Sequence, residues 1–304
     1  MGMTQSSRFW MFCLAFNLAG CAKPPQTFEV KGVVQEVLPE SKKVRIAHEK
    51  IPGYMEAMTM SFDVRDAREL AGLQPGDSVA FRMVVTTEDG WIEQVRKLGA
   101  ATNIVTVQAA PPDTFRRVRD VDPLNVGDLV PQYHFTNELG QAMSLEGFRG
   151  QAVAMTFLFT RCPFPTFCPR MTSNFEQAQK QLLARSGGPT NWHLLTVTFD
   201  PQYDTPAVLK AYAAAHGHDP RHWTYLTGDL VEITALTEQF GLMFWRPDPK
   251  EVLGISHNLR TVVLDTQGRV QRILKENEWK VDDLVAEIVK AAEVPLKPAA
   301  SLAR

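Results

Sequence analysis

The sequence predicts two domains, a small all-β domain followed by an α/β domain, and three observations support this fold class. The chain has 304 residues, a length that suggests about two domains, each able to bury a core of its own. Short strand-like runs fill residues 28–107, whereas strands and helices alternate over residues 126–293. Between them, residues 108–125 contain three prolines and show no apolar periodicity. This stretch is therefore expected to be an extended, semi-rigid linker.

The N-terminal domain is expected to be a small barrel of the OB type. Five runs of alternating or apolar residues predict its strands, at residues 30–37, 44–48, 58–62, 79–85 and 91–98. A short helical stretch is expected at residues 65–70. Five short strands at this spacing are typical of a small closed barrel.

The C-terminal domain alternates strands and helices in the order of a thioredoxin-like fold. Its expected strands are residues 151–160, 192–199 and 223–226, followed by a hairpin of residues 260–265 and 268–274. Its expected helices are residues 168–185, 206–215 and 229–240, and a last helix with an apolar stripe from 281 to 289. The first strand is apolar almost throughout, which indicates burial on both faces of the sheet. Residues 294–304 are expected to form a tail.

The composition excludes two broad classes of function. The chain has 32 basic and 34 acidic side chains, so it is not basic enough for a general nucleic-acid binder. With 44% hydrophobic residues and a formal net charge of -2, it is also too apolar and too weakly charged for a disordered chain.

Residues 1–20 have the pattern of an export signal. One charge, Arg8, precedes an apolar run over residues 9–16 that is too short to span a bilayer. The run ends in Leu18-Ala19-Gly20-Cys21, which resembles the lipobox of bacterial lipoproteins. That resemblance implies cleavage before Cys21, a lipid on its thiol, and a tether over residues 21–27 at a bacterial membrane, facing the periplasm or extracytoplasmic space. The alternative, an uncleaved membrane anchor, is disfavoured by the short run and its polar flanks.

Position decides the use of the four cysteines. Cys13 leaves with the signal and Cys21 carries the lipid, so the mature chain keeps Cys162 and Cys168. This pair follows a buried strand and opens a helix, where unpaired N–H groups and the helix dipole favour thiolate. A structural disulfide is the alternative, since disulfides persist outside the cytoplasm, where the export signal would place the chain. The strand-to-helix corner favours a functional pair, redox-active or metal-binding.

The C-terminal domain resembles the Sco/SenC family of copper-handling proteins, which have a thioredoxin-like fold. The resemblance rests on the cysteine segment ending in Cys168-Pro169, on residues 198–206 and on residues 256–265. It implies that Cys162, Cys168 and His257 bind copper. The family usually has three residues between the cysteines and this chain has five, so the copper geometry and the strain of a disulfide are open.

The chemistry of this donor set agrees with copper, because thiolates select Cu(I) and imidazole also accepts Cu(II). Zinc is possible with the same three ligands and an open fourth position. An iron–sulfur cluster usually requires four cysteines, and the mature chain has two. Asp200 is a candidate for orienting a ligand, or else a turn residue before Pro201.

A second candidate site lies in the N-terminal domain. His48 ends one expected strand, Met55 follows in the loop, and Met58 and Met60 lie two apart on the next strand, so both thioethers face the same way. Soft, neutral thioethers bind Cu(I), and residues 28–98 resemble the CusF-like periplasmic copper-binding domain. The resemblance implies a histidine and a Met-Thr-Met ligand set, with Met55 as a fourth ligand or a lid. The alternative is that the methionines only pack the core.

Together the two sites predict a membrane-tethered copper metallochaperone. The Sco/SenC resemblance implies delivery to the copper centre of a cytochrome c oxidase, and the dithiol requires a thiol reductant. The linker, about fifteen residues at roughly 3 Å each, lets the two sites meet, so we hypothesise that Cu(I) passes from the thioether site to the dithiol.

Two alternatives stay open. One is a thiol–disulfide oxidoreductase on the same fold, although such enzymes use Cys-x-x-Cys with a proline before the next strand, where this chain has His257. The other is a periplasmic copper buffer that protects the cell from the metal. Neither alternative calls for a nucleic-acid partner.

Overall fold

The computed structural model describes residues 24–55, 57–87, 89–100, 121–246, 255–277 and 279–296. The expected signal peptide, with Cys13 and Cys21, and most of the expected linker lie outside the described residues. Within the described part, no helix has both the length and the apolar character needed to cross a membrane.

The N-terminal domain is an antiparallel sheet of five strands in the order β3-β2-β1-β4-β5. The strands are β1 (Gln26–Leu38), β2 (Lys43–His48), β3 (Met58–Asp63), β4 (Asp77–Val85) and β5 (Gly90–Ala100), with the short helices η1 (Pro39–Ser41) and η2 (Ala67–Leu70). These are the five strands expected, and their arrangement agrees with the small barrel expected. The chain leaves β3 for η2, and a parallel bridge from Val64, directly after β3, to Ile92 of β5 joins the two edges of the sheet.

A glycine allows the first two strands to lie close together at the end that carries His48. Gly32 of β1 is the register partner of His48 in β2. A Cβ at position 32 would lie 2.6 Å from the carbonyl oxygen of Ala47. Only glycine fits this approach, which leaves His48 fully buried.

The C-terminal domain is built on a mixed sheet of seven strands in the order β14-β13-β8-β9-β10-β6-β7. Its parallel centre is β8 (Ala152–Leu158), β9 (Trp192–Thr198) and β10 (Trp223–Thr227). Antiparallel strands flank it: β6 (His134–Asn137), β7 (Ala142–Ser144), β13 (Arg260–Leu264) and β14 (Val270–Lys275). A separate two-stranded ribbon consists of β11 (Phe244–Trp245) and β12 (Ser256–His257).

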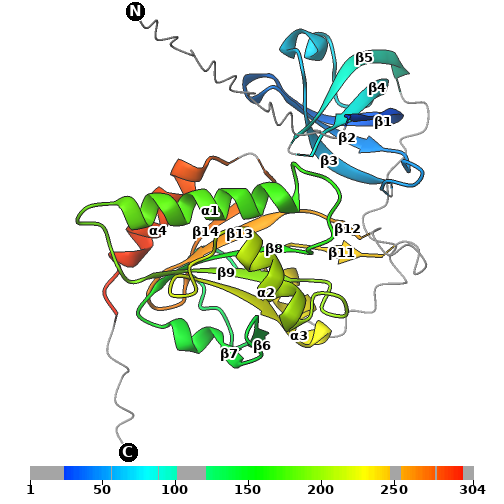
Figure 1. Cartoon of the computed structure of the whole chain (residues 1–304). Helices are drawn as coiled ribbons and strands as arrows, with labels where there is room; N and C mark the ends of the chain where they lie inside the picture. The colour runs from blue at the N-terminus through cyan, green and yellow to red at the C-terminus, as the bar shows by residue number, and fades with distance from the viewer. Residues whose placement is uncertain are drawn as a thin grey trace, which may run out of the picture.

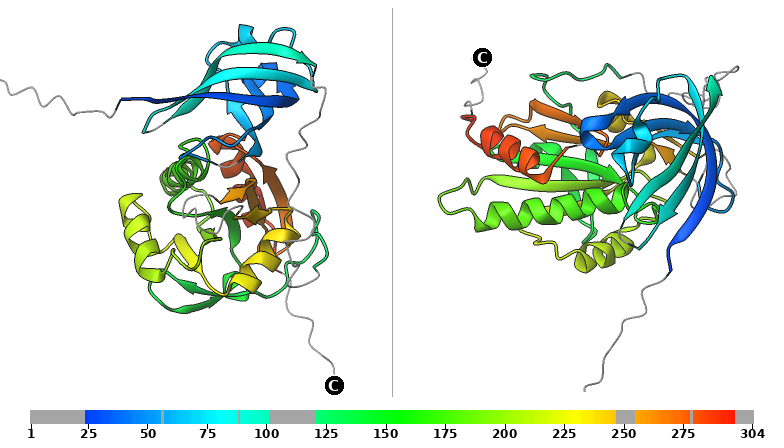
Figure 2. Two further views of the ribbon diagram at one scale, coloured as in Figure 1. Left: turned by 90° about the vertical axis from the view of Figure 1, so that its right-hand side faces the viewer. Right: turned by 90° about the horizontal axis from the view of Figure 1, so that it is seen from above.

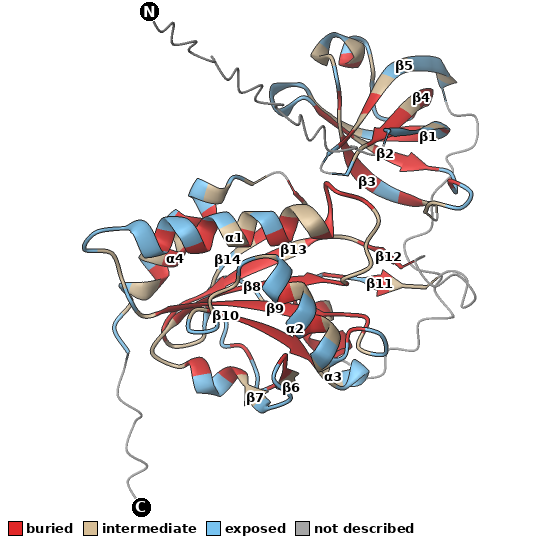
Figure 3. Cartoon of the chain, in the orientation of Figure 1, coloured by how far each residue is buried: buried red, intermediate tan, exposed pale blue. Residues whose placement is uncertain are grey.

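Helices cover both faces of this sheet, in the thioredoxin-like arrangement expected. The helices are α1 (Cys168–Ala184), α2 (Pro206–Ala215), α3 (Leu230–Gln239), α4 (Val281–Ala292) and the short η3 (Leu145–Phe148). Alternate residues of β8 point to opposite faces: Ala152 and Ala154 pack in a core with α1, α2 and α4, and Val153 and Met155 pack in a core with α3. The small alanines let the helices lie close to the sheet. Figure 3 shows buried residues concentrated along these central strands.

The two domains share a hydrophobic core. Four side chains of the C-terminal domain, Phe164, Phe167, Met171 and Leu259, pack with buried residues of the N-terminal sheet. Figures 1 and 2 show the N-terminal domain seated over the end of the C-terminal domain where the loop from β8 enters α1. That loop carries the thiol pair, so the contact between the domains lies at the candidate site.

Candidate metal centre

The two thiols lie at the ends of the loop that joins β8 to α1. Cys168 is the first residue of α1 and is fully buried. Cys162 is half-buried and closes a turn in which its backbone N–H donates to the Phe159 carbonyl at 3.2 Å. Both are free thiols. The strand-to-helix corner expected from the sequence is therefore present.

His257 reaches this corner from the ribbon of β11 and β12, where it pairs with Phe244. Its Nδ1 lies 3.0 Å from the Asn258 carbonyl oxygen, which only accepts hydrogen bonds, so Nδ1 carries a proton. Nε2 lies 3.7 Å from the Cys168 sulfur. This arrangement gives Nε2 the position of a metal ligand.

The ligand atoms of Cys162, Cys168 and His257 all lie within 4.8 Å of one another. The five-residue spacing between the cysteines therefore does not separate them. Three aromatic rings surround the imidazole, those of Phe159, Phe167 and Phe199. The centre is consequently apolar, and a bound ion there would be shielded from water.

The two thiols differ in acidity. Burial disfavours ionisation of Cys162, but hydrogen bonds from Cys168 and His257 outweigh it and hold the pKa of Cys162 well below its usual value. Burial and the neighbouring Cys162 sulfur raise the pKa of Cys168 well above its usual value. The helix start was expected to favour thiolate at this pair, without a choice between the two sulfurs. Cys162 is the thiolate of the pair.

Two buried carboxylates support the cysteine loop. Asp200 forms ion pairs with Arg161, the residue before Cys162, and with Arg246. Asp204 accepts hydrogen bonds from Thr160 and Thr198, which ties the end of β8 to the end of β9. Asp200 thus holds the side chain of the residue next to a thiol. Asp204, within the segment that carries the family resemblance, was missed because an aspartate in a turn has many possible uses.

The N-terminal constellation is assembled mainly by strand register. His48 is the register partner of Met58, and Met60 follows on the same face of β3. Met55 is half-buried and forms an isolated bridge with Ile51 in the loop before β3. Met58 and Met60 are buried, at 6% and 2% exposure. The structure therefore brings His48 and Met58 together, with Met60 on the same face and Met55 at the rim.

His48 has a free nitrogen in the domain core. Its Nδ1 donates to the Glu49 carbonyl oxygen at 2.7 Å, and among the described residues its buried Nε2 has no hydrogen-bond partner. Burial lowers the pKa of His48 to about 4, so the ring is neutral at pH 7. A buried nitrogen with a free lone pair is costly unless something binds it.

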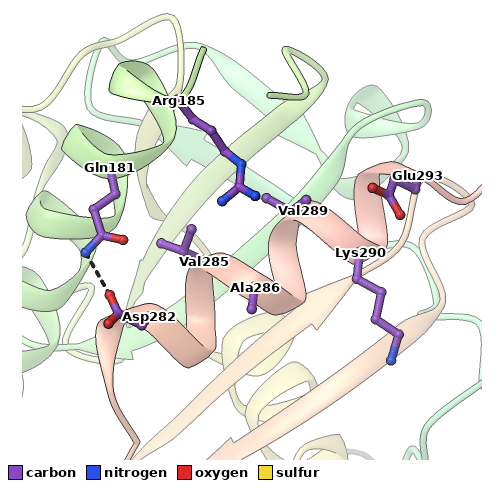
Figure 4. Close-up of a pocket in the computed structure, with 8 residues that line it drawn as sticks. All are labelled: Gln181, Arg185, Asp282, Val285, Ala286, Val289, Lys290 and Glu293. Atoms are coloured by element: carbon purple, nitrogen blue, oxygen red, sulfur yellow. Dashed lines mark hydrogen bonds between the residues drawn. The ribbon is translucent and has the colours of Figure 1, made fainter. Parts of the chain in front are cut away.

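Residues of both constellations line one small cavity. Its volume is about 30 Å³, and its walls include Met55 and Met58 from one domain and Cys162 and His257 from the other. A larger, open groove between α1 and α4 is lined by Gln181, Arg185, Asp282 and neighbouring residues, with Gln181 donating to Asp282 at 2.9 Å (Figure 4). The eight residues that line this groove include no thiol and no imidazole. The small cavity, which is lined by thioether, thiol and imidazole groups, is therefore the candidate metal site of the two.

Fold and site together define the class: a thioredoxin-like domain with two thiols and an imidazole at one centre, joined to a β-domain with a histidine–methionine cluster. Residues 121–293, more than half of the chain, match the SCO1/SenC family, and the chain belongs to this family. Residues 27–97 match the family described as copper binding periplasmic protein CusF, so the N-terminal domain is CusF-like.

Individual relatives match the chain over about half of its length. A SCO1 protein homolog of Bacillus subtilis is 29% identical over 176 residues, which are 56% of this chain and 86% of the relative. A SCO2-like protein of Rickettsia typhi is 27% identical over 156 residues, 49% of this chain and 69% of the relative. A solved SCO1/SenC family lipoprotein from Bacillus anthracis is 26% identical with a TM-score of 0.49, covering 56% of this chain and 98% of its own.

Proposed function

We propose that this protein is a copper metallochaperone that holds copper between Cys162, Cys168 and His257. The observation that carries the proposal is the convergence of these three ligand atoms within 4.8 Å in an apolar setting. Two thiolates select the soft Cu(I) ion, and the imidazole also accepts Cu(II). Copper is the cargo of this site. The His257 tautomer leaves Nε2 ready to bind, so little rearrangement is needed.

The N-terminal domain is proposed to hold a second Cu(I) ion between His48, Met55, Met58 and Met60. The buried Nε2 of His48 supports this, because a soft ion would satisfy its lone pair without bringing a hard charge into the core. Thioethers also stay usable in an oxidising compartment, where thiols are lost to disulfides. The domain is thus suited to capture copper before the thiol pair receives it.

The setting of this activity is proposed to be the outer face of a bacterial membrane. A lipid on Cys21 would tether the chain there, and the family resemblance implies the copper centre of a cytochrome c oxidase as the recipient. A thiol reductant is needed because Cys162 and Cys168 bind copper only when reduced.

A thiol–disulfide oxidoreductase is the second candidate, and the split acidity of the thiols favours it. A nucleophilic thiolate at Cys162 beside a protonated Cys168 is the arrangement that disulfide exchange uses. Insulin reduction by the reduced metal-free protein, compared with a Cys168→Ser variant, measures this activity. If insulin reduction stops when copper binds, disulfide exchange serves to keep the two thiols reduced until the metal arrives.

Anaerobic Cu(I) titration of the reduced mature protein tests the proposed function. The unaltered protein should bind two equivalents and the Cys162→Ser, Cys168→Ser double variant one. His257→Gln should weaken the C-terminal site, whereas His193→Gln, which changes a buried histidine outside both sites, should leave two equivalents bound. One equivalent in both the unaltered protein and the double variant would remove the copper role of the C-terminal domain.

Deletion of the gene separates delivery from buffering. Delivery predicts loss of cytochrome c oxidase activity that added copper restores. Sensitivity of the deletion strain to copper, with oxidase activity intact, would instead identify a buffer.

A further inference from the structure

We propose a third copper position between the domains, where the thioethers of Met55 and Met58 and the thiolate of Cys162 bind one Cu(I) ion together. This inference rests on the proposed function, because it gives the route between the two sites. The position is the 30 Å³ cavity that both domains line.

The size of the cavity supports one ion held from both sides. About 30 Å³ accommodates a single water-sized sphere, so the cavity has room for one ion between the residues that line it. Met55 and Met58 form the N-terminal wall, and Cys162 and His257 lie in the C-terminal wall. Every donor on this list is soft or an imidazole, which is the ligand set that Cu(I) prefers.

The longer cysteine loop holds the domains in this arrangement. Phe164, between the cysteines, is 2% exposed, and its ring packs against Tyr54 and Phe62 of the N-terminal domain. A Cβ on Gly90 of β5 would lie 3.2 Å from this ring, so the glycine makes room for it. The Tyr54 hydroxyl donates to the Pro163 carbonyl oxygen at 3.2 Å. The loop thus docks the N-terminal domain directly above Cys162.

Polar contacts lie on either side of Phe164, the aromatic plug between the domains, and fix the orientation of one domain on the other. Arg170 on α1 pairs with Asp63 and Asp89 of the N-terminal domain, each at 3.1 Å. Lys43 of β2 donates to Asn277 at 3.4 Å, and Asn277 donates in turn to the Thr166 carbonyl oxygen at 2.8 Å. The contacts come from separate elements, so they restrict rotation of one domain on the other.

The transfer is ligand exchange without electron transfer. Cu(I) leaves His48 and Met60 while Met55 and Met58 still hold it, and the Cys162 thiolate forms the new bond. Met55 and Met58 then release the ion as Cys168 and His257 bind it, and the Cys168 thiol loses one proton to solvent. Copper stays Cu(I) throughout. Two anionic thiolates replace neutral thioethers, so the exchange runs toward the C-terminal site.

A trapped intermediate tests this position. In a Cys168→Ser variant of the mature protein the final dithiolate site cannot form, while Cys162 stays available. With ¹³C-methyl methionine, one equivalent of Cu(I) should shift the Met55 and Met58 methyl signals. This variant should bind the ion about tenfold more tightly, or better, than the Cys162→Ser, Cys168→Ser double variant. Equal affinity in the two proteins would show that Cys162 does not join the thioethers and would overturn the proposal.

Two matched pairs of variants locate the effect. Met58→Leu should abolish the gain in Cu(I) affinity that Cys162 provides, whereas Met83→Leu, a buried methionine of β4, should preserve it.

Arg170→Glu should reduce this gain in affinity about three- to tenfold, because the reversed charge faces Asp63 and Asp89. Lys180→Glu, the same charge change on the α1 surface, should have no effect. An undiminished gain in Arg170→Glu would contradict a position that depends on docking. Failure of the unaltered protein to bind Cu(I) would instead refute the proposed function.

Discussion

Two histidines in different domains share one hydrogen-bonding pattern. In both His48 and His257, Nδ1 donates to the carbonyl oxygen of the following residue, which leaves Nε2 with a free lone pair. Each ring is therefore fixed in the tautomer that binds metal through Nε2. The donor is the histidine itself and the acceptor is its own chain neighbour, so no distant partner is required.

The unequal acidity of the thiols predicts unequal reactivity. At pH 6 to 7 Cys162 should react with iodoacetamide more than tenfold faster than Cys168, because one pKa unit changes the thiolate fraction about tenfold. The thiolate persists as pH falls until the lowered pKa of Cys162 is reached, so its reaction should stay fast at pH 6. Mass spectrometry of the two labelled peptides measures both rates.

His257 contributes to the acidity of Cys162 and can be changed to test this prediction. His257→Gln should slow labelling of Cys162 at pH 6, because the imidazole contributes to the lowered pKa. In 6 M guanidinium the two thiols should become equal. Equal rates in the folded protein would contradict the assigned acidities.

At this scale the residues could be predicted and their electrostatics could not. Cys162, Cys168 and His257 were identified from motif and resemblance, and the structure brings them together. The sequence favoured thiolate for the pair but could not say which sulfur carries it, because a helix start is visible in a sequence and complete burial is not. The free nitrogen of His48 depends on β1 and β2 closing over it at Gly32, which no local pattern reveals.

At the scale of elements, long apolar patterns were predicted well and short pairings were missed. The strand over residues 151–160 and the helix over residues 168–185 are β8 and α1 with nearly the same limits. The ribbon that carries His257 has two residues in each strand, so its pairing depends on tertiary contacts. In the N-terminal sheet, a single bridge from Val64 to Ile92 joins the two edges, and a contact this short leaves no sequence pattern.

A buried histidine on β9 predicts how the C-terminal sheet responds to acid. His193 lies against Thr224 of β10 at 2.8 Å, and burial lowers its pKa to about 4. Since the unfolded chain binds this proton near pH 6.5, its contribution to stability is complete above that pH and is lost as pH falls toward 4. The loss should amount to about 2 to 3 kcal/mol by pH 4.

Urea unfolding at pH 7 and pH 4.5 measures this loss. His193→Gln should reduce the pH dependence by about this amount and leave the part that buried His48 adds, whereas His134→Gln on β6, an exposed histidine, should not change it. A pH dependence that is the same in the unaltered protein and in His193→Gln would assign the acid sensitivity to other groups.

At the scale of the whole molecule, the sequence predicted a linker but not the docking. From the sequence, the two extra residues of the cysteine loop left the copper geometry and the strain of a disulfide open. In the structure the ligands still converge, and Phe164, within this longer loop, packs in the core of the N-terminal domain. A contact between domains depends on surfaces that are far apart in the sequence, so periodicity and motifs cannot reveal it.

Phe164 therefore predicts how the whole chain unfolds. Truncating a buried phenylalanine costs about 3 to 5 kcal/mol, and here that cost falls on the core that the two domains share, while the C-terminal domain keeps two further cores. Phe164→Ala should separate the thermal transitions of the two domains and increase the radius of gyration measured by small-angle scattering.

Phe164→Leu, which keeps most of the apolar contact, should stay close to the unaltered protein in both measurements. Cu(I) binding by Cys162, Cys168 and His257 should persist in both variants, because the loop ends are held by β8 and α1. If Phe164→Ala leaves the transitions and the scattering curve unchanged, the ion pairs of Arg170 hold the domains together without the aromatic plug.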